Sequence, residues 1–444
     1  MSERKQILLS LARISGKKVV LDFEGGCMSS DGGTLLLRHV EKQVGIVSRL
    51  SGTLRDRRHP SYVVHSLEDL LKQRILQIAC GYEDADDCDK LRGDPGFKAA
   101  CDRLPITGHD LASQPTLTRL ENSVNRSDLY RIAQAFVDAF LASYKKPPKA
   151  IILDLDDTDD PTHGSQQLSM FNAYYDEHCY LPLHIYEGRS GKLITTILRP
   201  GKSTNGTQVT AILKRLVRHI REAWPKVGIF LRADSRFSSP EVHDFCEDND
   251  ICYALGFNVN PKLKRMGQPL MDQALDLAHE SEKTIRLFTS FPYRAGSWRQ
   301  PRRVVYKAEV TLGKANPRAV VTNLNSSSAT FIYDRIYCAR GRMEGFIKDH
   351  KTFLHSDRTS CHRFEANQFR LFLHSAAYVL LHALRQQGLR GTQWANAQFN
   401  TIQNRFLKIG ARVMERATRI QFQFPTSYPL KCTLQTVVER FQEA

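Results

Sequence analysis

The stretch Ala150-Ile-Ile-Leu-Asp-Leu-Asp-Asp-Thr158 decides the fold, because the sequence changes its pattern there. Before it, from 30 to about 146, apolar residues recur at the three- and four-residue spacing of amphipathic helices. A basic, proline-containing hinge at 144–149 ends that pattern. After it, a helix and several short apolar runs typical of strands follow, the runs at 179–186, 192–198 and 227–232. The sequence therefore predicts a helical N-terminal region followed by a mixed α/β sheet.

The chain is long and strongly basic. It has 444 residues, and its 63 lysines and arginines exceed its 47 acidic residues, which gives a net charge of +16. At roughly 150 residues per domain, this length predicts two or three domains. The excess of positive charge points to a polyanionic partner, and nucleic acid is the leading candidate. No apolar stretch reaches the roughly 18 residues of a membrane span, so we expect a cytoplasmic protein that does not bind membranes.

Two groups of acids lie at the ends of predicted strands. Asp154 and Asp156 are two residues apart on the first strand, so their side chains share a face. Asp234 follows the strand at 227–232, and neighbouring strands lie about 5 Å apart. Two carboxylates about 4 Å apart repel each other by about 4 kcal/mol at an effective dielectric constant near 20, so a proton or a cation must join them. Oxygen ligands favour Mg²⁺ or Mn²⁺. The alternative is that the first group only caps the loop that follows.

A third constellation lies between Tyr337 and Lys351. At about 100° per helical residue, these two residues, Arg340 and Glu344 fall on one stripe of a helix roughly 60° wide. The helix would present an acid flanked by cations. Pairing of Arg340 with Glu344 on a solvated face is the simpler interpretation, and it leaves Tyr337 and Lys351 unexplained. No Cys-x-x-Cys pair suggests a zinc or redox site, and no Gly-x-Ser-x-Gly suggests a serine hydrolase.

These three pieces together resemble the DDE transposases of bacterial insertion sequences, whose catalytic core is ribonuclease H-like. One subgroup carries the signature Tyr-x2-Arg-x3-Glu-x6-Lys, and Tyr337 through Lys351 fits its spacing without a gap. Asp156-x-Thr158 on the first strand and an acid after a later strand also match that family. The resemblance spans about 150–384 and is weaker in the N-terminal region.

The resemblance implies a catalytic triad of Asp156, Asp234 and Glu344 that holds two Mg²⁺ or Mn²⁺ ions. Asp154 remains an alternative first ligand because it shares a face with Asp156. The resemblance also implies contacts with DNA near the scissile phosphate, from Tyr337, Arg340 and Lys351 and from their helix neighbours Arg342 and Lys348. Trp298 would stack on a base drawn out of the duplex, and a tryptophan buried in the core is the alternative.

The resemblance also implies an α+β multidomain layout, with a helical DNA-binding region at 1–146 and a catalytic core interrupted by a β-rich insertion. The core would comprise 150–258 and 333–388, the insertion 259–332, and a basic region 389–444. In this last region the spacing of five basic residues predicts a helix face that follows phosphates or is simply solvated: Arg405, Lys408, Arg412, Arg416 and Arg419.

The expected function is that of a bacterial, nucleoid-associated transposase. It would bind inverted repeats at transposon ends, cut the DNA and join 3′-hydroxyl ends to target DNA, as a homodimer in the synaptic complex. Two alternatives remain. One is a non-catalytic DNA-binding protein derived from a transposase, and the other is a ribonuclease H-like endonuclease that selects DNA structures.

Overall fold

The computed structural model describes residues 13–202, 206–281 and 283–443, which form two compact units. Of the described residues, the first unit comprises 13–43, 58–120 and 383–443, and the second comprises those of 44–57 and 121–382. The boundary near 120 precedes the predicted one at 146, because the last N-terminal helix packs on the sheet of the second unit. The C-terminal segment 383–443 groups with the N-terminal helices in the first unit. Within the described ranges, no helix has the length and apolar character needed to cross a membrane.

The first unit is mainly helical and joins segments far apart in the sequence. Gly33 lies so close to the C-terminal segment that an added Cβ would approach the Phe406 carbonyl oxygen to 1.8 Å. The Gly32 N–H also donates to the Ile409 carbonyl at 2.9 Å. The main elements of this unit are α1 (Thr34–Val44), α3 (Leu67–Ala79), α4 (Asp87–Leu91), α5 (Pro95–Ala100), α6 (Gln114–Ser123), α13 (Phe399–Ile402) and α14 (Lys431–Glu443).

The prediction of a basic helix near the C-terminus is wrong. A three-stranded sheet stands there, formed by β1 (Met28–Ser29), β14 (Ala411–Glu415) and β15 (Ile420–Gln423). Ala411 and Val413 are buried and Arg412 is exposed, which is the two-residue alternation of a strand. The five basic residues therefore do not share a helix face.

The second unit is built on one mixed sheet, in which β2 is flanked by an antiparallel and a parallel neighbour. The strand order is β10-β11-β13-β9-β8-β2-β6-β7, and β12 pairs with β11. β2 pairs in parallel with β8, and β8 pairs in parallel with β9, whereas β6 and β7 are antiparallel. The strands are β2 (Ala150–Asp157), β6 (Leu183–Glu187), β7 (Leu193–Ile197), β8 (Gly228–Ala233), β9 (Ile251–Phe257), β10 (Ile285–Tyr293), β11 (Arg302–Thr311), β12 (Lys314–Ala315) and β13 (Arg318–Thr322). A smaller sheet comprises β3 (Asp160–Pro161), β5 (Glu177–Tyr180) and β4 (Met170–Asn172).

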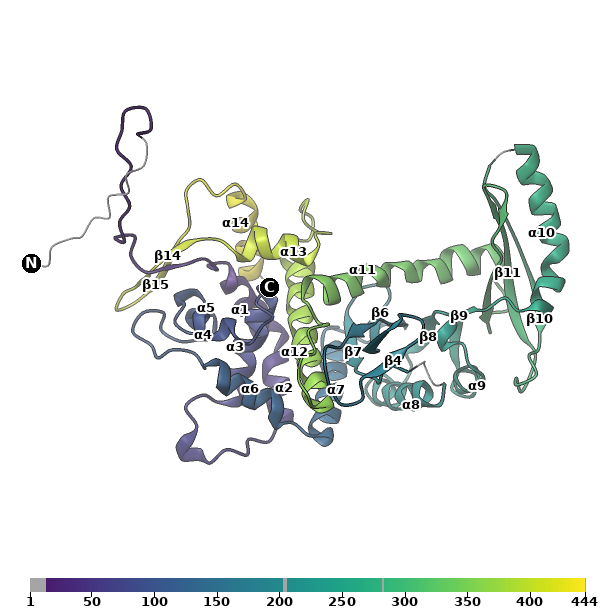
Figure 1. The fold of residues 1–444 in the computed structure, drawn as a ribbon, viewed down its shortest axis with the longest axis horizontal. Helices are drawn as coiled ribbons and strands as arrows, with labels where there is room; N and C mark the ends of the chain where they lie inside the picture. The colour runs from purple at the N-terminus through teal and green to yellow at the C-terminus, as the bar shows by residue number, and fades with distance from the viewer. Residues whose placement is uncertain (1–12, 203–205, 282, 444) are drawn as a thin grey trace, which may run out of the picture. The chain divides into compact units, whose positions relative to one another are not determined.

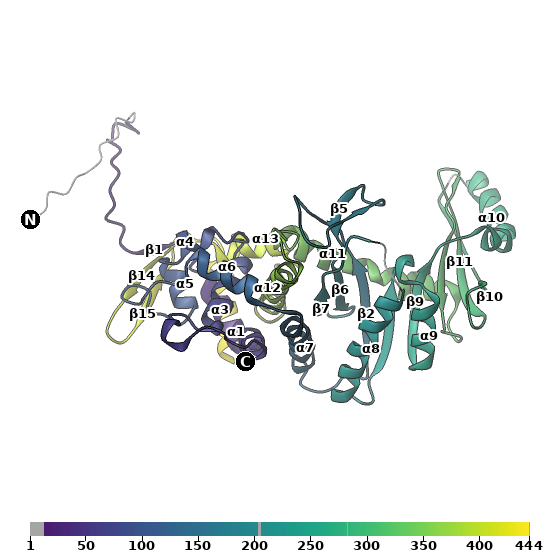
Figure 2. The same cartoon turned by 60° about the horizontal axis from the view of Figure 1, so that its bottom comes forward.

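The two faces of the large sheet carry different layers, as Figures 1 and 2 show. One face buries Ile151, Leu153 and Leu155 of β2 against α7 (Arg126–Ala142), α8 (Gly206–Ala223) and α9 (Pro240–Asp248). The other face is crossed by a continuous helical run, in which η3 (Phe331–Tyr337), η4 (Cys338–Gly341), α11 (Arg342–Lys348) and η5 (Asp349–Phe353) follow one another. α2 (Ile46–Thr53) and α12 (Phe364–Ala383) complete the unit. Because side chains alternate along β2, the layers place Asp154 and Asp156 on the face of the helical run.

The segment 259–332 carries the predicted strands, but it begins with a long helix that the prediction missed. α10 (Pro261–Ser281) packs on β10 and β11 through Met271, Ala274 and Tyr306. β13 pairs antiparallel with β9, so these strands extend the core sheet. The close approach of α10 depends on Gly267, where an added Cβ would lie 2.3 Å from the Tyr306 ring.

Trp298 does not lie on a DNA-facing surface, and its predicted stacking on a base is therefore wrong. It is only 3% exposed and belongs to the core of the second unit. Its ring centre lies 5.2 Å from that of Phe257, 5.3 Å from that of His243 and 5.5 Å from that of Tyr293. The Arg302 guanidinium lies 5.1 Å from the ring centre. The basic neighbours that suggested a DNA contact instead belong to this packing.

We expect Trp298→Ala to lower the free energy of unfolding by about 3–5 kcal/mol, because it removes a large buried aromatic side chain. Urea unfolding of the full chain, followed by circular dichroism, measures this change. A variant that unfolds like the wild type but loses DNA binding would contradict the core role.

Candidate active site

Asp156 and Asp234 lie side by side at the edge where two parallel strands end. The register pairs Leu155 of β2 with Ala233 of β8, so the next residue of each strand is one of these acids. Asp234 caps the short helix η2 (Ser235–Phe237), and its carboxylate accepts a hydrogen bond from the Arg236 N–H at 2.9 Å. Both side chains are partly open to solvent, with 14% of Asp156 and 22% of Asp234 exposed. The structure thus brings together two of the three predicted catalytic acids.

Asp154 lies on the same face of β2 as Asp156, but its carboxylate is bound by Arg232. It is fully buried, and its two carboxylate oxygens accept hydrogen bonds from Arg232 Nε and Nη2, each at 2.6 Å. Arg232 also donates to the Ile336 carbonyl oxygen at 2.9 Å, which ties the pair to the helical run. Gly188 packs so tightly on the pair that an added Cβ would approach Asp154 Oδ2 to 2.4 Å. A carboxylate enclosed in this way is not accessible to a metal ion.

Arg340 is the immediate partner of Asp156. Its Nη1 lies 2.7 Å from Asp156 Oδ2, and its side chain is 16% exposed. Burial raises the pKa of Asp156 to about 6, against the opposing charge of Arg340 and with a further contribution from the negative charge of Asp234. Burial lowers the pKa of Arg340, but the charge and hydrogen bond of Asp156, together with Tyr337 and Asp234, outweigh burial and leave that pKa above its ordinary value. The site therefore holds two acids that repel each other, each with an arginine close to it: Arg340 beside Asp156 and Arg236 beside Asp234.

The predicted helix from Tyr337 to Lys351 is present, but its pitch changes along its length. Tyr337 ends a π-helical segment, Arg340 lies in a 3₁₀ turn, Glu344 in an α-helical segment and Lys351 in a second π-helical segment. The residues therefore do not follow the constant 100° rotation assumed for the stripe. Short π-helical segments within helices are frequent at functional sites.

Tyr337 and Lys351 lie against the strand ends on either side of Arg340. An added Cβ on Gly256 of β9 would lie 2.6 Å from the Tyr337 hydroxyl, so the absence of a side chain there makes room for the tyrosine. Burial raises the pKa of Tyr337, and its neighbour Arg340 opposes that shift. Lys351 Nζ donates to the Asp159 carbonyl oxygen at 2.7 Å and lies 2.9 Å from its carboxylate. Both residues thus contact the segments that carry the acids.

Glu344 is not gathered with the other two acids. Its side chain is exposed, and no ion pair or hydrogen bond joins it to the described residues. Nor do three or more His, Cys, Asp or Glu side chains meet as a metal-binding group anywhere in the ranges that the structure describes. Arg342 and Lys348 are exposed as well, lying 6.0 Å from the Phe346 ring and 5.6 Å from the Phe353 ring. These three residues share α11 and point into accessible space.

Sequence reasoning missed the arginines that surround the acids. Arg236 lies 3.2 Å from Asp157 and 3.4 Å from Asp234, and the buried Arg199 also pairs with Asp157. Arg236 could have been found from its place two residues after Asp234. Arg199 could not, because it is 42 residues from Asp157 and the sheet brings the two together.

Comparison with known proteins identifies the family. The Transposase DDE domain group 1 family matches residues 11–444, which is nearly the whole chain. The chain belongs to this family of DDE transposases. A cryo-EM structure of a piggyBac transposase synaptic complex with hairpin DNA is similar over 84% of this chain and 78% of that one, at 12% sequence identity and a TM-score of 0.45. No curated protein sequence matches this DDE transposase.

The acids of this DDE transposase fit a divalent cation. Asp156 and Asp234 offer hard oxygen donors at adjacent strand ends, where they contact arginine side chains and main-chain N–H groups. Carboxylate oxygens are the ligands that Mg²⁺ and Mn²⁺ prefer. Burial and the negative charge of Asp234 raise the pKa of Asp156, and a cation bound beside it would oppose that shift by stabilising the ionised carboxylate. Asp156 and Asp234 are therefore the residues suited to hold such an ion.

We expect Asp154→Asn and Asp156→Asn to differ sharply in stability. Asp154→Asn leaves the charge of Arg232 buried without a counter-charge and should cost roughly 3–5 kcal/mol. Asp156→Asn should change the free energy of unfolding by no more than about 1 kcal/mol, because the lost ion pair is offset by removal of a carboxylate whose ionised form burial disfavours. Urea denaturation at neutral pH measures both. Equal losses of stability would contradict the distinct roles assigned to the two acids.

Proposed function

We propose that this DDE transposase binds the inverted repeats at transposon ends, cuts the DNA there and joins the 3′-hydroxyl ends to target DNA. The observation that carries the proposal is the pair Asp156 and Asp234 at adjacent strand ends, covered by Arg340 from a helix with the predicted signature spacing. A hard-cation site beside guanidinium and ammonium groups suits chemistry at a phosphodiester. We further propose that β7-β6-β2-β8-β9 form a ribonuclease H-like core, as in bacterial insertion-sequence transposases.

We propose that Asp156, Asp234 and Glu344 hold two Mg²⁺ or Mn²⁺ ions. When bound, such ions activate a water molecule or a 3′-hydroxyl and stabilise the leaving oxygen. Asp156 and Asp234 already lie together, whereas Glu344 would have to turn inward from α11. Its exposed side chain has the freedom to do so, because no described residue holds it.

The cations of the site would then act on the DNA. Arg340 compensates Asp156 in the protein alone, and we propose that its guanidinium donates hydrogen bonds to phosphate oxygens when DNA is bound. Lys351 lies on the other side of the acids and would stabilise charge that develops on the same phosphate. Tyr337, buried against Gly256, would position the DNA backbone through its hydroxyl, while the exposed Arg342 and Lys348 would bind phosphates farther along.

The positive net charge supports binding to double-stranded DNA, both at the transposon ends and at the target. When basic side chains bind DNA phosphates, the counterions condensed on the DNA are released. We therefore expect the logarithm of the binding constant to fall by about 0.9 per neutralised phosphate for each tenfold rise in salt concentration. Joining requires two ends to meet, and we propose a homodimer in the synaptic complex. The proposed location is the nucleoid of a bacterial cytoplasm.

We expect Mg²⁺-dependent cleavage of labelled end DNA and joining to a target plasmid, both absent in EDTA. Asp156→Ala, Asp234→Ala and Glu344→Ala should each lower the cleavage rate by at least about a hundredfold, because each removes a metal ligand. Asp248→Ala is the matched control, since Asp248 is an exposed acid at the end of α9 that pairs with Arg299. Gel electrophoresis of the labelled strands measures nicked and joined products, and a binding assay on the same DNA measures affinity.

The alternative functions predict different products. Cleavage without any joined product would favour a structure-selective endonuclease. Binding without cleavage of authentic ends would favour a DNA-binding protein derived from a transposase. Full activity of the Asp234→Ala enzyme would refute the proposed site itself.

A further inference from the structure

Beneath the helical run, a buried network of hydrogen bonds joins four polar side chains, with His350 of η5 at its centre. The Nδ1 atom of His350 lies 3.1 Å from the Tyr186 hydroxyl on β6, and its Nε2 lies 3.4 Å from the Ser375 hydroxyl on α12. The Ser375 hydroxyl also lies 2.7 Å from that of Thr196 on β7. All four residues are completely buried. A buried polar network whose members all have partners holds its surroundings in one arrangement.

The hydrogen-bond partners imply where each proton of this buried network lies. Ser375 donates its hydroxyl proton to the Leu371 carbonyl oxygen at 2.7 Å. Its oxygen therefore accepts from Thr196 and from His350. His350 then carries its proton on Nε2, and its Nδ1 accepts the hydroxyl proton of Tyr186. Burial lowers the pKa of His350 well below its ordinary value, which favours this neutral form.

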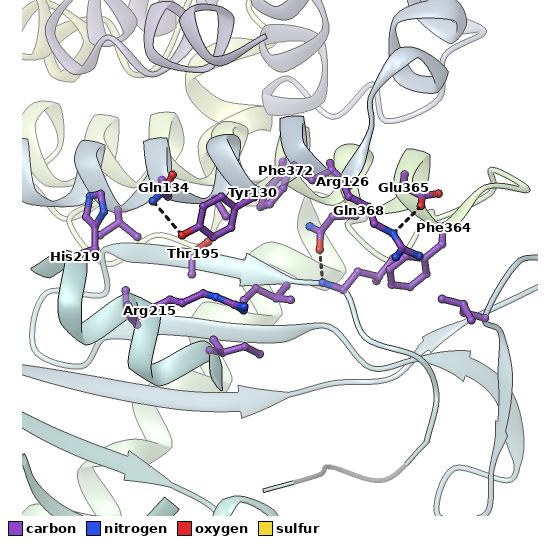
Figure 3. Close-up of a pocket in the computed structure, with 18 residues that line it drawn as sticks. Arg126, Tyr130, Gln134, Thr195, Arg215, His219, Phe364, Glu365, Gln368 and Phe372 are labelled. Carbon is purple, nitrogen blue, oxygen red and sulfur yellow. Dashed lines mark hydrogen bonds and ion pairs between the residues drawn. The ribbon is translucent and has the colours of Figure 1, made fainter. Parts of the chain in front are cut away.

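The elements that contact His350 are firmly joined to the large sheet. β6 and β7 are neighbouring strands of that sheet. α12 is tied to the end of β7, because Gln368 Oε1 accepts a hydrogen bond from the Leu198 N–H at 2.6 Å (Figure 3). On β6, the His184 ring packs edge-on against His350 with ring centres 4.9 Å apart, and the register places His184 opposite Asp156 of β2. His350 is therefore fixed one strand away from a proposed metal ligand.

The residue after His350 is Lys351, and both lie in the π-helical segment η5. A π-helical segment interrupts the regular rotation of an α-helix, so the direction of Lys351 depends on what fixes η5 itself. The hydrogen bonds of His350 join this segment to β6 and to α12. With His350 turned into the core, Lys351 reaches the loop after β2, where its Nζ donates to the Asp159 carbonyl oxygen at 2.7 Å.

We propose that His350 is a positioning residue that holds Lys351 beside the strand ends, where its ammonium group meets the scissile phosphate. The buried network fixes the His350 ring, the ring fixes the rotation of η5, and η5 directs Lys351 toward the edge that carries the acids. Residues that orient a functional side chain in this way affect activity without touching the substrate. The role of His350 rests on the one proposed for Lys351.

Acylation of lysine side chains in the full chain, without DNA, tests this positioning directly. Lys351 is held by Asp159, so it should react more slowly than Lys348, which is exposed on the same helical run. Tyr186→Phe removes only the hydroxyl that donates to His350. It should raise the reaction rate of Lys351 relative to Lys348 about fivefold, because η5 then leaves its position more often. Mass spectrometry after brief treatment with an N-hydroxysuccinimide ester measures both rates.

Tyr378→Phe is the matched control. The Tyr378 ring centre lies 5.3 Å from that of Tyr186, and its hydroxyl donates to the Gly191 carbonyl oxygen at 2.9 Å, a main-chain group outside the buried network. Each variant loses one buried hydrogen bond, so we expect similar falls in the urea midpoint. Tyr378→Phe should leave the reactivity of Lys351 unchanged. Unchanged Lys351 reactivity in Tyr186→Phe, or an equal increase in both variants, would overturn the proposal.

The rate of end cleavage tests what the positioning serves. In single turnovers at saturating DNA and Mg²⁺, Lys351→Ala should lower the rate about a hundredfold and Tyr186→Phe about fivefold, with DNA affinity unchanged in Tyr186→Phe. In a Lys351→Ala background, Tyr186→Phe should have no further effect, because the network acts through Lys351.

The outcomes separate this inference from the proposed function. Equal effects of Tyr186→Phe with and without Lys351 would indicate a merely structural role and overturn the inference. A wild-type rate for Lys351→Ala would refute the role of Lys351 and the inference with it. Failure of the wild type to cleave authentic ends would refute the proposed function, while the lysine reactivities would still decide whether His350 positions Lys351.

Discussion

The parallel pairing of β2 with β8 is the constraint on which the site depends. Because their register matches Leu155 with Ala233, both strands end at the same edge, and the next residue of each is an acid. On the other side of β8, β9 continues the parallel set. The antiparallel strands β6 and β7 complete the sheet on the other side of β2.

Placing several carboxylates in one partly buried strand is electrostatically unfavourable, and the fold compensates each of them with a cation from a distant segment. Asp154 has Arg232, Asp156 has Arg340, and Asp157 has Arg199. On the face of the helical run, the Asp154 pair is closed to solvent and serves stability, whereas Asp156, two residues nearer the end of β2, is partly open to solvent. This gradient from a sealed to an accessible carboxylate distinguishes a structural acid from one suited to a metal ion and DNA.

Much of this arrangement could be predicted from the sequence, because it rests on local patterns. The change from helical to strand periodicity at 150 located β2, and the signature spacing from Tyr337 to Lys351 located the helical run that covers it. Asp156 and Asp234 could be paired because parallel strands end at one edge. The sequence could not assign a partner to Asp154, since Arg232 meets it only through the register of two strands 78 residues apart.

The predictions that failed did so because contacts between distant segments determine the structure at those positions. Basic residues near Trp298 suggested DNA, but the ring is sealed in a core formed by residues from β9, α9 and β10. Helical spacing of basic residues at the C-terminus could not compete with the alternation that places Ala411 and Val413 in a sheet. The changes of helical pitch between Tyr337 and Lys351 carry no sequence signal that a constant helical periodicity can detect.

The most direct measurement is iron-induced cleavage of the protein chain. Fe²⁺ replaces Mg²⁺ at oxygen-rich sites, and with ascorbate and hydrogen peroxide it breaks the backbone next to where it is bound. If Asp156 and Asp234 hold the metal ion, peptide breaks detected by mass spectrometry should concentrate beside these two residues. Excess Mg²⁺ and Asp156→Asn should both suppress them. Breaks elsewhere in the chain, or breaks at these positions that persist in Asp156→Asn, would contradict a metal site at the ends of β2 and β8.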